Sequence, residues 1–330
     1  MMKYTCYNCG APLKVTPESI VVICEYCGKP SLISGKADLS KIFVIPSYSR
    51  DYVARAFWRK ASRDFDLRRI LNEISLRKIE GLYLPVWIGR IRLQGRVSYY
   101  YYVTEHETVW VGHGRRKRRV VRTRRRRVYR VENIDQETVV PVVARRQYFR
   151  LGAREAAARL VSIDLNRVSR RLLDIDPEYW SKIKLEVLNT ELDEKMVSAK
   201  MREDAVDSLR EYYRSKGYID YFYVVPQGPF NLALYLAPLW HVCYEYKGSL
   251  YSAFLTGWDL SLVVKTEPMT TVRRIMYVLG AAASIVASPI LALISLNSET
   301  FELLILPLLA IAGAYYFSSS FIKSVRVERR

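Results

Sequence analysis

The sequence predicts an α+β protein made of a small N-terminal cysteine-rich ribbon, a β-rich body with helices, and a C-terminal hairpin of two apolar helices. Three observations lead to this class: two Cys-x-x-Cys pairs near the start, strand-like alternation of apolar and polar residues in the middle, and two uncharged apolar runs near the end. The length of 330 residues allows two or three domains. We expect their boundaries at residues 1–35, 36–268 and 269–330.

The ribbon at residues 1–35 contains four of the five cysteines, which form two pairs separated by 14 residues. A glycine follows the second cysteine of each pair and permits the left-handed backbone of a tight turn. Four thiolates on two such turns can surround Zn²⁺ tetrahedrally, whereas disulfides are rare in cytoplasmic proteins. The sequence therefore predicts a zinc ribbon with Zn²⁺ as cofactor and these ligands: Cys6, Cys9, Cys24 and Cys27.

The ribbon carries little net charge. Three lysines oppose two glutamates among residues 1–35, so the net charge is only +1. Binding to nucleic-acid phosphates relies on clustered basic residues. We therefore favour a folding unit or a docking site for a protein partner over a nucleic-acid reader.

The body, residues 36–268, is predicted to be an α+β domain. A period of two residues predicts strands at 42–46, from 81 through 111, and at 139–144 and 221–225. A second β unit is expected from 236 to 268, with a hairpin turn at Lys247-Gly248. Helices are expected after Ser49 and at 67–79, 154–161, 165–173, 177–184 and 190–213.

Two short segments of the body resemble each other. Leu82–Trp87 and Leu236–Trp240 both read apolar, proline, apolar, tryptophan, and both lead into alternating strand patterns. This similarity is consistent with an internal duplication of a β-rich half.

The most polar feature of the chain is the basic segment at residues 115–127. Ten of its 13 residues are Lys or Arg, and they supply +10 of the net charge of +19. The basic residues are Arg115, Arg116, Lys117, Arg118, Arg119, Arg122, Arg124, Arg125, Arg126 and Arg127.

If residues 118–131 form a strand, arginines lie on both of its faces, because strand side chains alternate. Such a strand cannot lie in a core, so we expect a two-stranded arm or a strand along an anionic surface. The alternative is a solvated, disordered loop, since blocks of like charge repel. The nearby rings of Tyr99–Tyr102 and Trp110 can stack on bases or belong to the strand core, and we favour the core.

The C-terminal segment contains two uncharged apolar runs at 275–296 and 303–322. As helices they extend roughly 33 and 30 Å, enough to cross a bilayer core of about 30 Å. Basic residues flank the pair, and the loop between the runs has none. The positive-inside rule then predicts an integral, multi-pass protein of the cell membrane with cytoplasmic N- and C-termini. The alternative, a buried hairpin of a soluble protein, usually has a polar stripe, which these runs lack.

These parts together resemble a family of prokaryotic zinc-ribbon membrane proteins, often labelled for a transcription-factor-B-type or helicase-type ribbon. The resemblance is carried by the cysteine pairs and by Leu82–Trp87, Leu236–Trp240, Tyr244–Tyr251 and Glu267–Met269. It implies a short ribbon with zinc on the four cysteines, a β-rich cytoplasmic domain and C-terminal transmembrane helices. It implies no helicase activity, because the chain has no Walker loop, and the arginine block departs from the family's pattern.

No catalytic motif accompanies these features. The three histidines are not in an HExxH motif, and GxSxG and phosphate-binding loops are absent from the sequence. His241 and Cys243 share a predicted strand face, which a half-buried strand explains.

We expect a membrane-anchored, zinc-binding, non-enzymatic adaptor whose arginine-rich arm contacts an anionic partner, either lipid headgroups or nucleic acid. The alternatives are a DNA- or RNA-binding protein tethered to the membrane and a subunit of a larger membrane complex.

Overall fold

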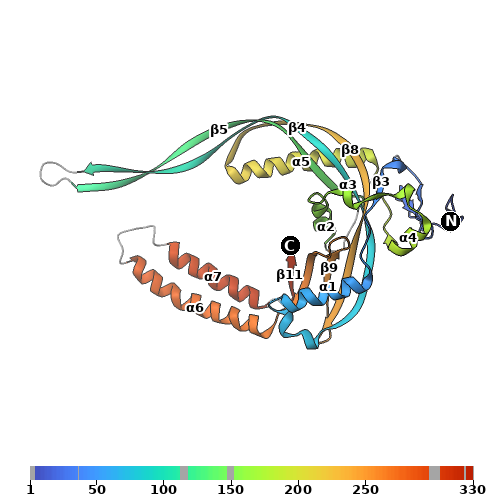
Figure 1. Cartoon of the computed structure of the whole chain (residues 1–330). Coiled ribbons are helices and arrows are strands. Elements are labelled where there is room, and N and C mark those ends of the chain that lie inside the picture. Colours follow the sequence, from blue (N-terminus) through green and yellow to red (C-terminus); the bar gives the residue numbers. More distant parts are fainter. Residues whose placement is uncertain are drawn as a thin grey trace. The chain divides into compact units, whose positions relative to one another are not determined.

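The computed structural model describes residues 4–35, 37–111, 118–146, 152–296, 305–322 and 325–329. These residues form helices and a curved, mainly antiparallel β-sheet, which confirms the α+β class (Figure 1). The chain divides into two compact units, each assembled from separate segments. Unit 1 comprises residues 1–45, 83–149 and 157–237, and unit 2 comprises residues 46–82, 150–156 and 238–330.

Unit 1 is organised by long strands. β4 (Ser75–Val111) pairs with β5 (Arg118–Val143) in one continuous antiparallel register. β8 (Tyr218–Tyr246) also pairs with β4, and β3 (Ile42–Val44) runs parallel to β8. The first residues of β4 and the last residues of β8 belong to unit 2. The two proline–tryptophan segments therefore lie inside long strands, not at the start of strands as the sequence predicts.

The two strands β4 and β8 approach each other closely at Gly95. A Cβ atom on Gly95 would lie 2.0 Å from the carbonyl oxygen of Tyr223 and 2.8 Å from the Cα of Val224. Both of these are main-chain atoms, which cannot move aside as a flexible side chain can. Glycine is therefore the residue that this crossing requires.

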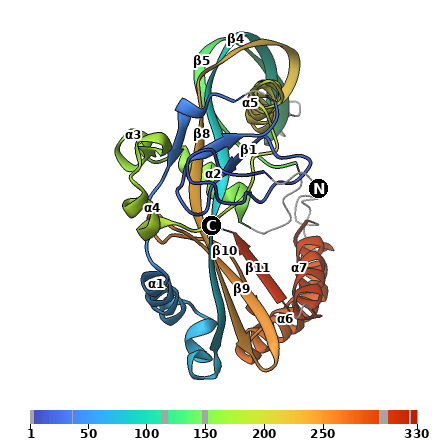
Figure 2. The same ribbon diagram turned by 90° about the vertical axis from the view of Figure 1, so that its right-hand side faces the viewer.

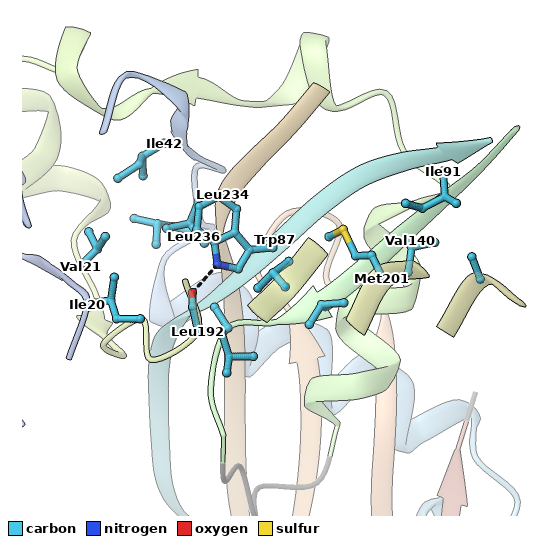
Figure 3. Close-up of a cluster of buried hydrophobic side chains, with 14 of the residues drawn as sticks. Ile20, Val21, Ile42, Trp87, Ile91, Val140, Leu192, Met201, Leu234 and Leu236 are labelled. Carbon is cyan, nitrogen blue, oxygen red and sulfur yellow. Dashed lines mark hydrogen bonds between the residues drawn. The ribbon is translucent and has the colours of Figure 1, made fainter. Parts of the chain in front are cut away.

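The core of unit 1 contains one face of helix α5 (Glu194–Lys216). Every fourth residue of α5 is buried and forms one apolar stripe: Val197, Met201, Ala205, Leu209 and Tyr213. Trp87 of β4 packs in the same cluster and donates its indole N–H to the carbonyl of Leu192 at 3.0 Å (Figure 3). Asp193 caps α5, so the helix begins later than its predicted start at Thr190, and it continues to Lys216, beyond its predicted end at Tyr213.

Short elements connect β5 to α5 in the chain. They are α2 (Ala153–Leu160), α3 (Leu165–Val168), β6 (Arg170–Arg171), η5 (Leu172–Asp174), α4 (Pro177–Ile183) and β7 (Glu186–Val187). The helix predicted at 165–173 is thus too long. The observed helix α3 ends at Val168, and β6, which follows it, pairs with β3. Pro177 opens α4 at the first helical position, where its missing N–H needs no partner.

Unit 2 contains helix α1 (Arg50–Arg63) and a hairpin formed by the end of β8 with β9 (Ser249–Thr256). Phe57 of α1 packs against Tyr244, with ring centroids 5.3 Å apart. The hairpin turn has positive φ at both central residues, 48° at Lys247 and 79° at Gly248. This is the signature of the two-residue turn that the sequence predicts, and the prediction is confirmed.

The helix predicted at 67–79 is wrong. The chain instead makes two single turns of 3₁₀-helix, η2 (Leu67–Arg69) and η3 (Leu71–Glu73), before β4 begins at Ser75. The Asp64 carboxylate accepts the backbone N–H groups of Asp66 and Leu67, which fixes a tight turn at this point. Leu67, Ile70 and Ile74, within and beside these turns, are buried at helical spacing, but the stretch is too short for a helix.

Two apolar helices complete unit 2, α6 (Thr271–Leu296) and α7 (Ile305–Ile322), and they lie side by side (Figure 2). The predicted loop between them falls outside the described residues. A Cβ on Gly280 of α6 would lie 3.1 Å from the ring of Phe317, so a small residue permits the close packing of the helices.

The chain returns to the sheet after α7. β11 (Val325–Arg329) pairs antiparallel with β10 (Leu262–Pro268), the strand that precedes α6. The sequence predicts only a basic tail here. The pairing holds the two ends of the helical pair next to each other.

Candidate metal centre and arginine-rich arm

Two matched turns present the four cysteines. In the first turn the N–H of Gly10 donates to the carbonyl of Cys6 at 2.9 Å, and in the second the N–H of Gly28 donates to the carbonyl of Cys24 at 2.9 Å. Both glycines have positive φ, 71° and 73°. The two Cys-x-x-Cys-Gly motifs therefore fold in the same way, as their sequence predicts.

The four sulfur atoms form a compact group, all within 4.8 Å of one another. The sulfurs of Cys6 and Cys27 are 3.6 Å apart, and those of Cys9 and Cys24 are 3.7 Å apart. A disulfide would bring two sulfurs to about 2.05 Å. A tetrahedral zinc ion with ~2.3 Å bonds sets its sulfurs about 3.8 Å apart. The four cysteines can therefore hold a metal ion without rearrangement.

The pKa values of the cysteine thiols also indicate a place for a cation beside the sulfurs. Burial raises the pKa of the Cys24 thiol to about 12 and raises the pKa of Cys27 as well. At Cys6 burial opposes ionisation, but backbone N–H groups at Cys9 and Asn8 outweigh it and lower the pKa to about 7. Buried thiolates need a positive charge beside them, and a bound metal ion supplies it.

The ribbon is hydrogen-bonded to the rest of unit 1. The N–H of Ile20 donates to the carbonyl of Thr190 at 2.7 Å, and the N–H of Thr190 donates to the carbonyl of Val21 at 3.1 Å. These contacts extend the small sheet of the ribbon, which consists of β1 (Val21–Ile23) and β2 (Pro30–Leu32). The ribbon is therefore joined edge-on to the segment that leads into α5.

The ribbon also shares its core with unit 1. Ile20 and Val21 belong to the same buried cluster as Trp87 (Figure 3). A Cβ on Gly28 would lie 2.7 Å from the ring of Trp180, whose indole N–H donates to the carbonyl of Glu25 at 3.3 Å. A metal ion in the ribbon would thus be bound beside the core that the ribbon shares with unit 1.

The arginine-rich segment forms one strand of a two-stranded arm. β8 begins at Tyr218, whose ring stacks on Tyr100, and beyond Tyr102 the described arm consists of β4 and β5 alone. The described segment is therefore a strand and not the disordered loop considered above. Six arginines have described side chains, and all are exposed: Arg119, Arg122, Arg124, Arg125, Arg126 and Arg127. Arg115, Arg116 and Lys117 lie outside the described residues, and only the backbone of Arg118 is described.

The register of the arm gives it two chemically different faces, because residues opposite each other across the strands share a face. We call one the aromatic face, and its pairs include Trp110–Arg119, Thr108–Val121, Thr104–Arg125, Tyr102–Arg127 and Tyr100–Tyr129. It carries three arginines and no acid, a net charge of +3.

The opposite side of the arm is the Glu–Arg face. Its pairs, from the outer end inward to Tyr101, are Val111–Arg118, Val109–Val120, Glu107–Arg122, Glu105–Arg124, Val103–Arg126 and Tyr101–Val128. Four arginines, including Arg118 by its register, are on the same face as two glutamates, so the net charge is +2. The guanidinium of Arg126 donates to the carboxylate of Glu105 at 2.8 Å. The aromatic face therefore has the larger net charge, and its arginines are not balanced by any acid on the same face.

The tyrosines on the aromatic face contact one another. The ring of Tyr100 lies 5.3 Å from Tyr218, 5.5 Å from Tyr129 and 5.9 Å from Tyr102, and the guanidinium of Arg127 lies 5.2 Å from its centroid. Tyr99, one position away on the opposite face, is buried in the core of unit 1. The alternation along the strand therefore divides Tyr99–Tyr102 between the core and the surface. The prediction of core packing is confirmed for Tyr99 and wrong for Tyr102 and Trp110, which are 44% and 67% exposed.

Trp110 differs from these tyrosines. It is 67% exposed and makes no ring contact with any residue that the structure describes. Val121, one pair nearer to the body on the same face, is 60% exposed. The outer part of the aromatic face thus combines uncovered apolar side chains with arginines.

One helix of unit 2 is long and apolar enough to cross a membrane. This span is Val272–Leu296, and the apolar part of α7, Ile305–Ser320, is shorter. Only 6% of the first span is buried, and Leu279 and Leu293 are each 64% exposed. A core helix of a soluble protein would bury such side chains.

A second group of titratable residues surrounds Lys265 in unit 2. Its ammonium forms ion pairs with Asp64, with Glu267 at 2.6 Å and with Glu328 at 3.0 Å. The three carboxylates are close enough to hold a metal ion, but the ammonium already lies among them and balances part of their charge. This group joins β11 to β10 and to the turn after α1.

The histidine and cysteine noted in the sequence have packing partners. His241 shares a hydrogen bond of 2.8 Å with Ser252, and its ring stacks on Phe254 with centroids 4.6 Å apart. Cys243 lies opposite Ser252 in the β8–β9 register. These contacts belong to the hairpin of unit 2.

Comparison with known proteins gives no relative. No family model, curated protein or solved structure matches the chain. The features that bear on function are therefore the arm, the cysteine group and the apolar helices.

Proposed function

We propose that the chain is a membrane-anchored, zinc-binding, non-enzymatic adaptor whose arginine-rich arm contacts an anionic partner. The observation that carries this proposal is the exposure of six arginines on a two-stranded arm. Like charges held this close repel one another, and an anionic surface removes that repulsion. A guanidinium also suits phosphate recognition, because its planar donors form paired hydrogen bonds.

The anchor in this proposal is a transmembrane hairpin formed by α6 and α7. The exposed apolar surface of α6 supports it, and so does the pairing of β10 with β11. Because these paired strands precede α6 and follow α7, the two crossings must begin and end on one side of the bilayer. Arg273 and Arg274 lie at the start of α6, so the positive-inside rule assigns that side to the cytoplasm.

The metal in this proposal is Zn²⁺, held by Cys6, Cys9, Cys24 and Cys27. An all-thiolate, tetrahedral donor set favours zinc over harder divalent cations. Its role is structural, because the ribbon shares the core of unit 1. The exposed rings of Tyr7 (68%) and Tyr26 (65%), one in each turn, are candidates for a protein partner.

Heparin is a suitable first probe, because it is a polyanion that presupposes neither lipid nor nucleic acid. Full-length protein in detergent should elute from immobilised heparin at a markedly lower salt concentration after the six described arm arginines are changed to Ser. The reason is that the elution salt follows the number of anion contacts.

A matched control removes the same charge elsewhere. Six exposed basic residues serve for it: Arg55, Arg59, Arg154, Arg167, Lys195 and Lys200. Their replacement by Ser should shift elution much less. Equal shifts for the two variants would show that net charge alone governs binding, and the role of the arm would then have to be abandoned.

A further inference from the structure

We propose that the aromatic face of the arm is a membrane-contact surface that binds anionic phospholipid headgroups, with Trp110 at the lipid–water interface. This inference rests on the proposed function and names its partner. It also assigns the contact to one of the two faces.

Charge is the first reason for choosing this face. Arg119, Arg125 and Arg127 have no acid beside them on the aromatic face. On the opposite face Glu105 and Glu107 lie across from arginines, and Arg126 is bonded to Glu105. An anionic leaflet attracts basic side chains within about a Debye length, so the unbalanced face is attracted more strongly.

The apolar side chains on the same face are the second reason. Trp110 is opposite Arg119 in the register, and Val121 is in the adjacent pair of the same face. Both are exposed by 60% or more. An indole favours the headgroup level of a bilayer, where its ring is shielded from water and its N–H stays hydrogen-bonded. Arginines around such a ring match the lipid phosphates at the same depth.

The tyrosines favour lipid over single-stranded nucleic acid. Binding of successive bases uses a series of free ring faces. Tyr100, Tyr102, Tyr129 and Tyr218 instead pack against one another, and Arg127 lies over two of them. Trp110 and the smaller imidazole of His106 are the only rings on the aromatic face of the described arm without a ring contact, which is sufficient for an interfacial anchor and poor for stacking a strand of bases.

The anchor of the same chain makes a weak lipid contact effective. A surface tethered to a membrane meets it at a high local concentration, so a few arginines and one indole are sufficient. The contact would then be reversible and would depend on the anionic lipid content and on the salt concentration.

Tryptophan quenching by brominated lipid tests this inference directly. The chain has six tryptophans, at positions 58, 87, 110, 180, 240 and 258, and none lies in α6 or α7. Full-length protein is reconstituted in vesicles of phosphatidylcholine with or without phosphatidylglycerol, and the phosphatidylcholine carries bromine near the headgroup. We expect extra quenching in the anionic vesicles, and Trp110→Phe should remove that extra quenching.

Two triple variants of equal charge separate the faces. Arg119, Arg125 and Arg127 changed to Ser should reduce the quenching of Trp110 to the level in pure phosphatidylcholine. Arg122, Arg124 and Arg126 changed to Ser should leave most of it. Equal effects of the two triples would overturn the assignment to one face.

The remaining outcomes separate this inference from the proposed function. Unquenched Trp110 in wild-type protein, together with binding of a labelled single-stranded oligonucleotide that the aromatic-face triple abolishes, would overturn lipid contact and leave an anionic partner in place. If the protein is not quenched, does not bind the oligonucleotide and elutes from heparin as the six-arginine variant does, both proposals fail. The wild-type measurement and Trp110→Phe decide the lipid question even if a triple variant does not fold.

Discussion

Arg126 donates to Glu105 across the two strands of the arm at 2.8 Å, whereas Arg127, the next residue along β5, lies over the ring of Tyr100. One step along the strand thus changes an ion pair into a cation–π contact, because neighbouring residues point to opposite faces. The exposed pair contributes little to stability. Its consequence is that it balances charge on one face of the arm only.

The cysteine group predicts a strong dependence of unit 1 on metal. Cys24→Ser should abolish stoichiometric zinc binding and lower the Tm of the detergent-solubilised protein, on the order of 10 °C, because zinc binding is folding free energy in such ribbons. Elemental analysis and thermal scans measure both effects. Cys243→Ser, which changes a cysteine outside the ribbon, should retain the metal. Binding of one full equivalent of metal by Cys24→Ser would contradict the assignment of the site to the four cysteines.

The close crossing of β4 and β8 predicts that Gly95→Ala is destabilising by roughly 3 kcal/mol. The new methyl group would meet the main chain at Tyr223 and Val224, which must shift to admit it. Denaturant unfolding in detergent measures the change. Ser98→Ala, a substitution in the same strand that adds no atoms, should be nearly neutral. A Gly95→Ala protein as stable as wild type would show that the strands are farther apart than described.

The ion pairs of Lys265 predict acid sensitivity of unit 2. Burial opposes ionisation of Asp64, but the ammonium of Lys265 and the N–H groups of Leu67 and Asp66 outweigh it and hold the pKa of Asp64 below its ordinary value. A carboxyl with a lowered folded-state pKa contributes stability that is complete above about pH 4 and is lost as the pH falls through the folded value.

The corresponding measurement is the Tm between pH 7 and pH 3 for wild type and for Asp64→Asn. The variant should be less stable at pH 7, and its Tm should fall less on acidification. Asp220→Asn, at an exposed position, serves as the control and should follow wild type. Parallel curves for wild type and Asp64→Asn would contradict the assignment of this stability to Asp64.

The sequence predicts well where a local rule is sufficient. Matched Cys-x-x-Cys-Gly motifs predict two equivalent turns, and Lys247-Gly248 predicts a two-residue hairpin turn, because each depends on backbone conformations that few residues adopt. The strand at 118–127 is different, because arginines occupy both of its faces and no apolar–polar alternation marks it. It could be stated only conditionally, because repulsion between the arginines favours a loop.

Features that depend on distant partners could not be predicted. The two faces of the arm follow from the register of β4 with β5, which places Glu105 opposite Arg124 and Trp110 opposite Arg119. β11 alternates valine with charged residues over only five positions, which is too short to predict a strand without the edge of β10 that it pairs with. The prediction of a helix at 67–79 was wrong because Leu67, Ile70 and Ile74 have helical spacing, but their burial comes from tertiary packing and not from a helix.

The central claim is that α6 and α7 lie in a lipid bilayer, and alkaline extraction of the membrane fraction tests it most directly. The full-length chain, expressed in cells, should remain in the membrane pellet after washing with sodium carbonate at high pH, and detergent should release it. Recovery of folded chain in the alkaline supernatant without detergent would contradict the claim.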